Sequence, residues 1–257
     1  MKIDKNILIL LGYDYVNALE DLLDSQNIRI VIDQSDLKYM RSESLHKLNS
    51  LMGDRLLVSL NYRNDIKNFD NSCMFSCLIT LGWRKLLVVD DFKNIPLLIN
   101  VHPALLPEYK GYHPVPFVIL NSEGSHGITA HLINSEMDAG DIVLKKEFPI
   151  TPFSTLSSLQ YSVNQCMPNF LKELLELISA GNISVTKNLD SLTKVRAPKR
   201  KPEDSEIFLS DSVDLMFKKV KASDPDRFPA YFVINGEKVF IRLYRDSKAS
   251  RQTKFDI

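Results

Sequence analysis

Residues Asn6–Asp33, NILILLGYDYVNALEDLLDSQNIRIVID, decide the fold class of this chain. An apolar run ends at Gly12, a segment with apolar residues at helical spacing follows, and a second apolar run ends at Asp33. This order predicts a βαβ unit with two parallel strands. A dinucleotide-binding turn needs several glycines beside the first strand. Because Tyr13 follows Gly12, we expect no dinucleotide fingerprint.

Five more apolar runs follow, first at helix-length spacing and then closer together. They predict an α/β fold, with a Rossmann-like, mostly parallel sheet that has an antiparallel edge. A long amphipathic helix is predicted from Ser154 to Ala180, ending at Gly181 and bent at Pro168. The five runs are RLLVSL (55–60), MFSCLITL (74–81), IPLLINV (95–101), GITAHLI (127–133) and GDIVLKKEF (140–148).

The composition changes after residue 190. The segment KVRAPKRKPEDSE (194–206) has no hydrophobic period and predicts a linker or an extended surface arm. A short helix and a β-hairpin turning at Asn235-Gly236 are predicted after it. We therefore expect a main domain at 1–190, and a linker arm with a small C-terminal subdomain at 191–257. Because hairpin edges pair readily, a homodimer through this subdomain is expected.

The overall charge and the N-terminus exclude several classes of protein. The 257 residues carry 32 basic and 32 acidic side chains, so nothing in the bulk charge favours nucleic acid or a membrane surface as a partner. The first apolar run is too short for a signal peptide or a membrane span, so we expect a cytoplasmic protein. Cys73, Cys77 and Cys166 lack metal or redox spacing and are interpreted as core thiols.

Polar residues gather behind the run IPLLI, in NVHPALLPEYKGYHP (100–114). Asn100 and His102 are two positions apart, so their side chains leave the strand on the same face. Asp138, in the turn after the next strand, is expected to reach His102. Such a set suits acyl transfer, because Asn stabilises an oxyanion, His moves a proton and Asp supports the His. Turn stabilisation remains the alternative, and any attacking group would belong to the substrate.

These motifs resemble the folate-dependent formyltransferases. The family signature runs Asn-x-His-Pro-Ser-Leu-Leu-Pro-x-Tyr-x-Gly, followed by a His-bearing strand and an Asp-x-Gly-Asp turn. This chain has NVHPALLPEYKG and GITAHLINSEMDAGD, with Ala104 in place of Ser, and the resemblance covers roughly residues 1–180. It implies that 1–190 is a catalytic domain, that Asn100, His102 and Asp138 are catalytic, and that 10-formyltetrahydrofolate is the formyl donor. No metal is expected.

The resemblance also implies ligand contacts. His131 is interpreted as a structural neighbour of the catalytic residues. Trp83 is equally typical of a core aromatic, and the basic pair in the arm is equally typical of a solvated charge run. The implied contacts are Trp83, Arg84, Leu86, Asn134 and Met137 for the folate donor, Tyr112 and His113 for the sugar, and Lys199 and Arg200 for a diphosphate.

The implied acceptor is a nucleotide-linked amino sugar. The ribonucleotide branch of the family needs a Gly/Ser-rich phosphate loop, which LGYDYVNA (11–18) does not supply. The tRNA branch carries a basic C-terminal barrel, whereas 209–257 is too balanced in charge for that task. We therefore expect formylation of the 3- or 4-amino group of a dideoxyhexose, with dTDP as carrier, for bacterial surface polysaccharide (O-antigen) synthesis.

Three alternatives remain at this point. The first is an enzyme like methionyl-tRNA formyltransferase. The second is a metal-dependent hydrolase that uses His102, His131 and Asp138 as a two-His, one-carboxylate site. The third is a folate- or nucleotide-sugar-binding module without catalysis. Loss of activity in His102→Ala would separate an enzyme from a binding module.

Overall fold

The computed structural model describes residues 5–22, 25, 27–66, 74–189 and 195–242 of the chain. The strands are β1 (Ile7–Leu11), β2 (Ile28–Asp33), β3 (Leu56–Ser59), β4 (Cys77–Leu81), β5 (Leu98–His102), β6 (Lys110–Gly111), β7 (Ser125–Leu132), β8 (Ile142–Pro149), β9 (Arg196–Ala197), β10 (Tyr231–Ile234) and β11 (Glu237–Phe240). The α-helices are α1 (Ser42–Met52), α3 (Pro114–Leu120), α4 (Leu156–Ala180) and α5 (Val213–Lys221). The 3₁₀ helices are η1 (Tyr13–Leu22), η2 (Gln34–Tyr39), η3 (Gly53–Arg55), η4 (Val89–Phe92) and η6 (Pro202–Ser205).

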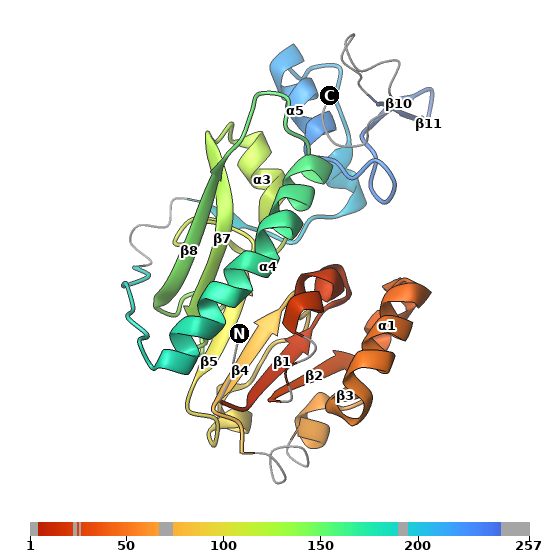
Figure 1. The fold of residues 1–257 in the computed structure, drawn as a ribbon. Coiled ribbons are helices and arrows are strands. Elements are labelled where there is room, and N and C mark those ends of the chain that lie inside the picture. Colours follow the sequence, from red (N-terminus) through yellow and green to blue (C-terminus); the bar gives the residue numbers. More distant parts are fainter. Residues whose placement is uncertain (1–4, 23–24, 26, 67–73, 190–194, 243–257) are drawn as a thin grey trace. The chain divides into compact units, whose positions relative to one another are not determined.

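Seven strands form one sheet in the order β3-β2-β1-β4-β5-β7-β8 (Figure 1). The strands from β3 to β5 pair in parallel, and β7 pairs antiparallel with β5. Every residue of β1 and β4 is buried, as expected for central parallel strands that are covered on both faces. The prediction of a Rossmann-like, mostly parallel sheet with an antiparallel edge is therefore confirmed.

The chain divides into two compact units, each with its own apolar cluster. The cluster of the first unit contains Leu8, Leu10 and Leu78, and that of the second contains Val115, Val118 and Leu159. The predicted C-terminal segment 191–257 belongs to the second unit, together with two earlier segments. The first unit comprises 1–102, 129–145 and 164–188, and the second comprises 103–128, 146–163 and 189–257.

The segment after β1 differs from the prediction, because it forms the 3₁₀ helix η1 rather than an α-helix. The turn that precedes it packs tightly. The N–H of Gly12 donates to the carbonyl of Leu81 at 2.8 Å, and a Cβ on Gly12 would lie 2.0 Å from the carbonyl oxygen of Gly82. The turns after β1 and β4 therefore meet backbone against backbone, with the Tyr15 ring against Gly82.

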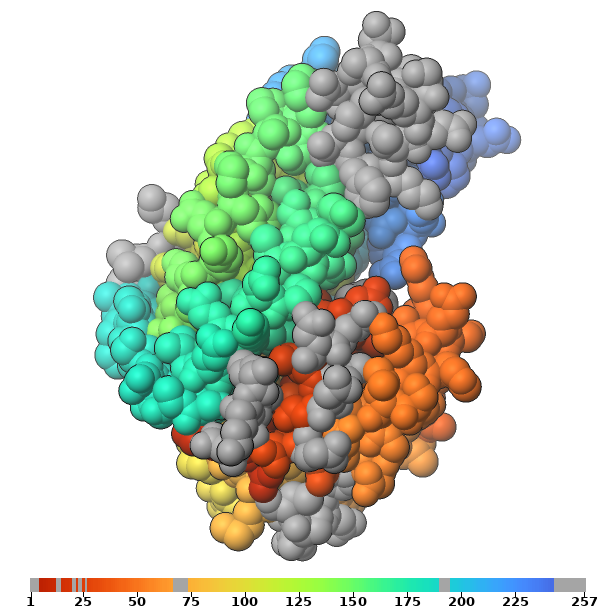
Figure 2. Space-filling view, in the orientation of Figure 1, coloured from red at the N-terminus to blue at the C-terminus, as the bar shows by residue number. Residues whose placement is uncertain are grey.

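Helix α4 matches its predicted extent and runs through Pro168. It ends before Gly181, whose φ of +70° is the left-handed conformation of a glycine C-cap. Its apolar positions, among them Met167 and Leu174, are buried. The opposite side of the helix is exposed, and α4 is visible in green at the surface in Figure 2.

The C-terminal segment forms the predicted helix α5 and hairpin. Ser212 caps α5, accepting from the N–H of Leu215 at 3.2 Å. Asn235 and Gly236, with φ of +50° and +84°, make the turn between β10 and β11, as the Asn-Gly signal predicts. The predicted arm contains two short elements, β9 and η6, and β9 pairs in parallel with β6.

The interpretation of the cysteines as core thiols holds for Cys77, which is buried. Burial raises the pKa of its thiol to about 12. Cys166 is free and half-buried, and Cys73 lies outside the described residues. Within the described part of the chain, no helix combines the length and apolar character that crossing a membrane requires.

Candidate functional site

A row of polar side chains crosses three strands of the sheet in register. Thr80 of β4 pairs with Asn100 of β5, and Asn100 pairs with His131 of β7. Paired residues of neighbouring strands point to the same face, as do residues two apart along a strand. The three side chains therefore lie side by side, and His102 projects from the same face.

The side chain of Asn100 is oriented by the groups on either side of it. Thr80 Oγ1 donates to Asn100 Oδ1 at 2.7 Å. Asn100 Nδ2 donates to Asp138 Oδ1 at 3.1 Å. An ionised carboxylate only accepts hydrogen bonds, so the amide nitrogen must face Asp138 and the amide oxygen must face Thr80.

The contacts of His131 define its tautomer. Its Nδ1 lies 2.8 Å from the carbonyl of Leu132, which only accepts, so this nitrogen carries the proton of the neutral ring. Nε2 is then free to accept from Asn100 Nδ2, at 3.0 Å. His131 thus takes one amide proton of Asn100, and Asp138 takes the other.

Asp138 lies between two imidazoles. Its Oδ2 is 3.6 Å from Nδ1 of His102, and its Oδ1 is 3.4 Å from Nε2 of His131. The exposed fractions of His102, His131 and Asp138 are 5%, 2% and 9%, so the Asp138 carboxylate interacts with the His102 ring with little solvent screening. A neighbouring carboxylate favours the charged form of an imidazole, so Asp138 is placed to stabilise a protonated His102.

This geometry is suited to acyl transfer. The three residues named from the sequence, Asn100, His102 and Asp138, come together in the first unit. Thr80, which orients Asn100, was not named from the sequence. In the sequence it is a polar residue within the apolar run of β4, but only the strand register shows that Thr80 lies beside Asn100.

The described residues contain no cluster of three or more His, Cys, Asp or Glu that is arranged to hold a metal ion. The set named for a metal site is engaged in hydrogen bonds instead. His131 directs Nε2 at the amide of Asn100, and Asp138 accepts from that same amide. The observed contacts therefore favour the acyl-transfer interpretation over the hydrolase alternative.

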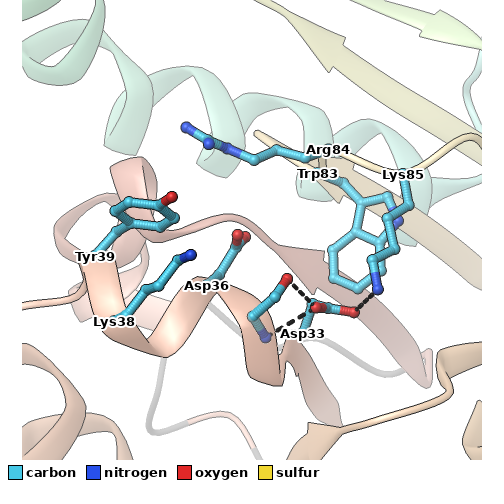
Figure 3. Close-up of a pocket in the computed structure, with 8 residues that line it drawn as sticks. Asp33, Asp36, Lys38, Tyr39, Trp83, Arg84 and Lys85 are labelled. Carbon is cyan, nitrogen blue, oxygen red and sulfur yellow. Dashed lines mark hydrogen bonds and ion pairs between the residues drawn. The ribbon is translucent and has the colours of Figure 1, made fainter.

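A pocket of about 270 Å³ opens in the first unit at the C-terminal ends of β2 and β4 (Figure 3). Asp33 stands two positions beyond Val31, which shares the row of Leu10 and Thr80, so it leaves the sheet on the face of the polar row. Trp83 and Arg84, two predicted donor contacts, line this pocket. The full lining is Asp33, Ser35, Asp36, Lys38, Tyr39, Trp83, Arg84 and Lys85.

The predicted donor contacts differ in their surroundings. Trp83 packs against the apolar cluster and meets the Tyr62 ring edge-on, with ring centroids 5.4 Å apart. The Arg84 guanidinium lies over the Tyr39 ring at 5.7 Å. Leu86 is 68% exposed and does not line the pocket. Asn134 and Met137 are exposed in the turn before Asp138, where Asn134 Oδ1 accepts from the N–H of Glu136.

Asp33 and Asp36 are the buried carboxylates of this pocket, and Asp33 is the one paired with Lys85. Burial pulls its pKa upward, but an ion pair with Lys85 and hydrogen bonds from the hydroxyl and N–H of Ser35 outweigh burial, so the pKa falls below its ordinary value. A carboxyl with a depressed pKa stabilises the fold above its unfolded pKa, and this contribution disappears as the pH falls through the folded pKa.

Lys85→Met is therefore expected to destabilise the protein by about 1–3 kcal/mol near pH 7, because it leaves a buried carboxylate oxygen without its cation. The loss should shrink as the pH falls through the folded pKa of Asp33, where the carboxylate takes up a proton. Urea unfolding across a series of falling pH values measures it. Lys38→Met is the matched control, since Lys38 lines the same pocket but lies over the Tyr39 ring. An equal loss in both variants, or no pH dependence, would contradict the assignment.

The predicted sugar and diphosphate contacts all lie in the second unit. The pairing of β6 with β9 brings Tyr112, whose N–H donates to Ala197 at 2.7 Å, beside the segment that carries Lys199. Tyr112, His113 and Lys199 are exposed. Arg200 is differently placed, because its guanidinium donates to the carbonyls of Ala222 and Asp204 at 2.7 and 2.9 Å. The Arg200 guanidinium therefore binds backbone of the C-terminal segment, which differs from the predicted contact with a diphosphate.

The loop that presents Tyr112 is anchored within the second unit. The hydroxyl of Tyr109 donates to Glu123, and burial, together with this acceptor, raises the pKa of Tyr109. The carboxylate of Glu108 accepts from the N–H of Val195 at 2.9 Å. These contacts hold the chain just before β6.

Comparison with known proteins finds a family model that matches the part of the chain carrying these residues. The model of the formyl transferase family matches residues 59–175, which include the polar row and Asp138. Methionyl-tRNA formyltransferase of Thermotoga maritima is 28% identical over 199 residues, covering 77% of this chain and 58% of that protein. The chain therefore spans less than two thirds of the length of this curated relative.

Solved structures match over a larger share of the chain. A 4-N formyltransferase of Francisella tularensis has a TM-score of 0.71 at 18% identity, covering 93% of this chain and 97% of that one. A sugar 3-N-formyltransferase solved in the presence of dTDP and 5-N-formyl-THF has a TM-score of 0.70 at 20% identity, covering 91% and 84%. These likenesses establish a shared fold.

Proposed function

We propose that this chain, whose residues 59–175 match the formyl transferase family model, moves a formyl group from 10-formyltetrahydrofolate to the amine of a nucleotide-linked sugar. The acceptor in this proposal is the 3- or 4-amino group of a dideoxyhexose carried by dTDP. The reaction chemistry in this proposal rests on one observation, which is that Asn100 and the buried side chains of His102 and Asp138 lie together.

Each of these side chains has a role in the transfer. The acceptor amine attacks the formyl carbon, and protonated His102 stabilises the oxyanion that forms. Asn100 Nδ2 joins it by turning one of its two N–H groups from Asp138 or His131 toward the oxyanion. Asp138 takes the amine proton, directly or through water, as the new C–N bond forms. The bond from the formyl carbon to N10 of the folate then breaks, and the proton passes to N10. No covalent intermediate with the protein is required.

Exposed side chains supply the proposed ligand contacts. Leu86 and Met137 offer apolar surface to the folate, with Trp83, Arg84 and Asn134 as its further contacts. Tyr112 and His113 meet the sugar, and Lys199 meets the diphosphate. We leave Arg200 out of this set, because its donors are engaged with backbone carbonyls.

The sugar acceptor is supported by the match along the chain. Two solved formyltransferases, a 4-N formyltransferase and a sugar 3-N-formyltransferase, align with more than nine tenths of this chain and with most of their own length. One of them was solved with dTDP and a formylated folate, which supports the nucleotide and the donor of the proposal. A role in surface polysaccharide synthesis, and a homodimer through β10 and β11, belong to the same proposal.

Methionyl-tRNA is the second candidate acceptor, because curated relatives that match this chain are named methionyl-tRNA formyltransferases. Against it stands the balanced charge of the C-terminal segment. A protein that neutralises several tRNA phosphates needs an excess of Lys and Arg where it binds.

The acceptor can be identified directly. The full chain is incubated with 10-formyltetrahydrofolate and, in separate reactions, with dTDP-, GDP- and UDP-linked 3- and 4-amino-dideoxyhexoses and with charged initiator tRNA. We expect mass spectrometry to show a gain of one formyl group on a dTDP-sugar. Formylation of the tRNA alone would replace the sugar proposal with the second candidate. Transfer to none of them would overturn both.

A further inference from the structure

We propose that Asn188 is a positioning residue, which holds Asp138 in the conformation needed for formyl transfer. The inference rests on the proposed function for its consequence in catalysis. Its geometric part depends only on contacts within the first unit, which contains both residues. Asn188 is 6% exposed, stands 50 positions beyond Asp138 and is the last residue of that unit.

The side chain of Asn188 is committed to the turn that carries Asp138. Its Nδ2 donates to the carbonyl of Asp138 at 2.8 Å and to the carbonyl of Gly140 at 2.9 Å. A primary amide has two N–H donors, and here both serve one turn. The backbone N–H of Asn188 also hydrogen-bonds the carboxylate of Asp141. A single residue therefore contacts the turn at three points.

The turn requires this support because of the conformation of Asp138. Its φ of +53° lies in the left-handed region, which residues other than glycine seldom adopt. Strained backbone of this kind persists only where its surroundings hold it. In this conformation the carboxylate faces Asn100, His102 and His131. Rotation out of the left-handed region would swing the carboxylate away from all three.

The neighbours of Asn188 hold a different part of the turn. Thr186 exchanges two backbone hydrogen bonds with Ile142, at 2.7 and 2.8 Å, and Lys187 pairs with Asp141 at 2.7 Å. The Lys187 side chain is 74% exposed, and an exposed pair of this kind contributes little to stability. Among these three residues, Asn188 is the one whose side chain contacts the backbone of Asp138.

The test compares Asn188→Ala with Lys187→Ala in the full chain. Asn188→Ala is expected to lower kcat about tenfold or more and to leave the KM for the formyl donor within about twofold, since it moves Asp138 and no proposed donor contact. Lys187→Ala should leave both constants unchanged. An unchanged kcat in Asn188→Ala, or an equal loss in Lys187→Ala, would overturn the positioning role.

A second measurement reads the position of Asp138 without any substrate. The chain has five histidines, so the imidazole nitrogens can be followed through a pH titration by NMR. In Asn188→Ala we expect His102 to lose its proton at lower pH than in the wild type, because the neighbouring carboxylate has moved away. An unchanged titration refutes the inference even if the wild type formylates nothing. If Asn188→Ala does not fold, the same readout applies to Asn188→Gln, whose longer side chain displaces the amide.

Discussion

Asp138→Asn is expected to lower kcat for formyl transfer by about 10²–10⁴-fold, the range that a positioned acid or base contributes. The carboxylate is the only group in the cluster that is both anionic and in contact with His102 and Asn100. The amide that replaces it cannot take up the proton of the attacking amine, and it withdraws the charge that favours protonated His102. Binding of the donor should change little, because Asp138 is buried and is not one of the proposed donor contacts.

Asp141→Asn is the matched control for this variant. It makes the same chemical change three positions along the same turn, at a carboxylate that pairs with Lys187 instead of an imidazole. We expect it to retain most of the activity. Rates measured under donor saturation compare the two variants directly. If Asp138→Asn keeps more than about a tenth of the wild-type rate, or if both variants lose activity alike, the role assigned to Asp138 is wrong.

The strands of this fold could be read from the sequence because their runs are apolar. Central strands such as β1 and β4 are buried on both faces, so nearly every residue is hydrophobic and the run stands out. The antiparallel edge was predicted from the short spacers between the last apolar runs. The 3₁₀ form of η1 could not be read, because the spacing of its buried residues is also that of an α-helix.

The side chains of the site were only partly predictable. Asn100 and His102 share a face because they are two apart in one strand, and this follows from local geometry alone. Thr80 and Asn188 became visible only in the folded chain, since strand register and the path after α4 bring them to Asn100 and Asp138. Contacts between distant segments leave no periodic signal in a single sequence.

The basic arm shows the same limit. Lys199 and Arg200 are adjacent and alike in charge, so the sequence gives no reason to separate them. In the structure Lys199 is exposed, whereas Arg200 donates to two carbonyls of its own subdomain. The domain boundary at 190 stays a prediction. Composition changes there, but β7, β8 and α4 each contribute residues to both compact units.

Gly140→Ala is expected to destabilise the protein by at least about 3 kcal/mol, at the upper end of the cost of overpacking. A Cβ at this position would lie 1.7 Å from the carbonyl oxygen of Leu132, which is backbone and cannot rotate aside. Relief requires the end of β7 to separate from the turn, which breaks the hydrogen bond from the N–H of Leu132 to Asp141 at 2.9 Å. The carbonyl of Leu132 also accepts from His131, so the polar row would move with it.

Gly124→Ala is the control that distinguishes the effect of this close contact from the general effect of replacing a glycine. A Cβ on Gly124 meets no atom within 4 Å, and neither glycine has a positive φ, so both variants gain the same backbone stiffness in the unfolded chain. Urea unfolding should place Gly124→Ala at or slightly above the wild-type stability and Gly140→Ala well below it. Equal stability of the two variants would mean that the turn carrying Asp138 does not pack against β7. In that case the left-handed conformation of Asp138 would depend on Asn188 alone.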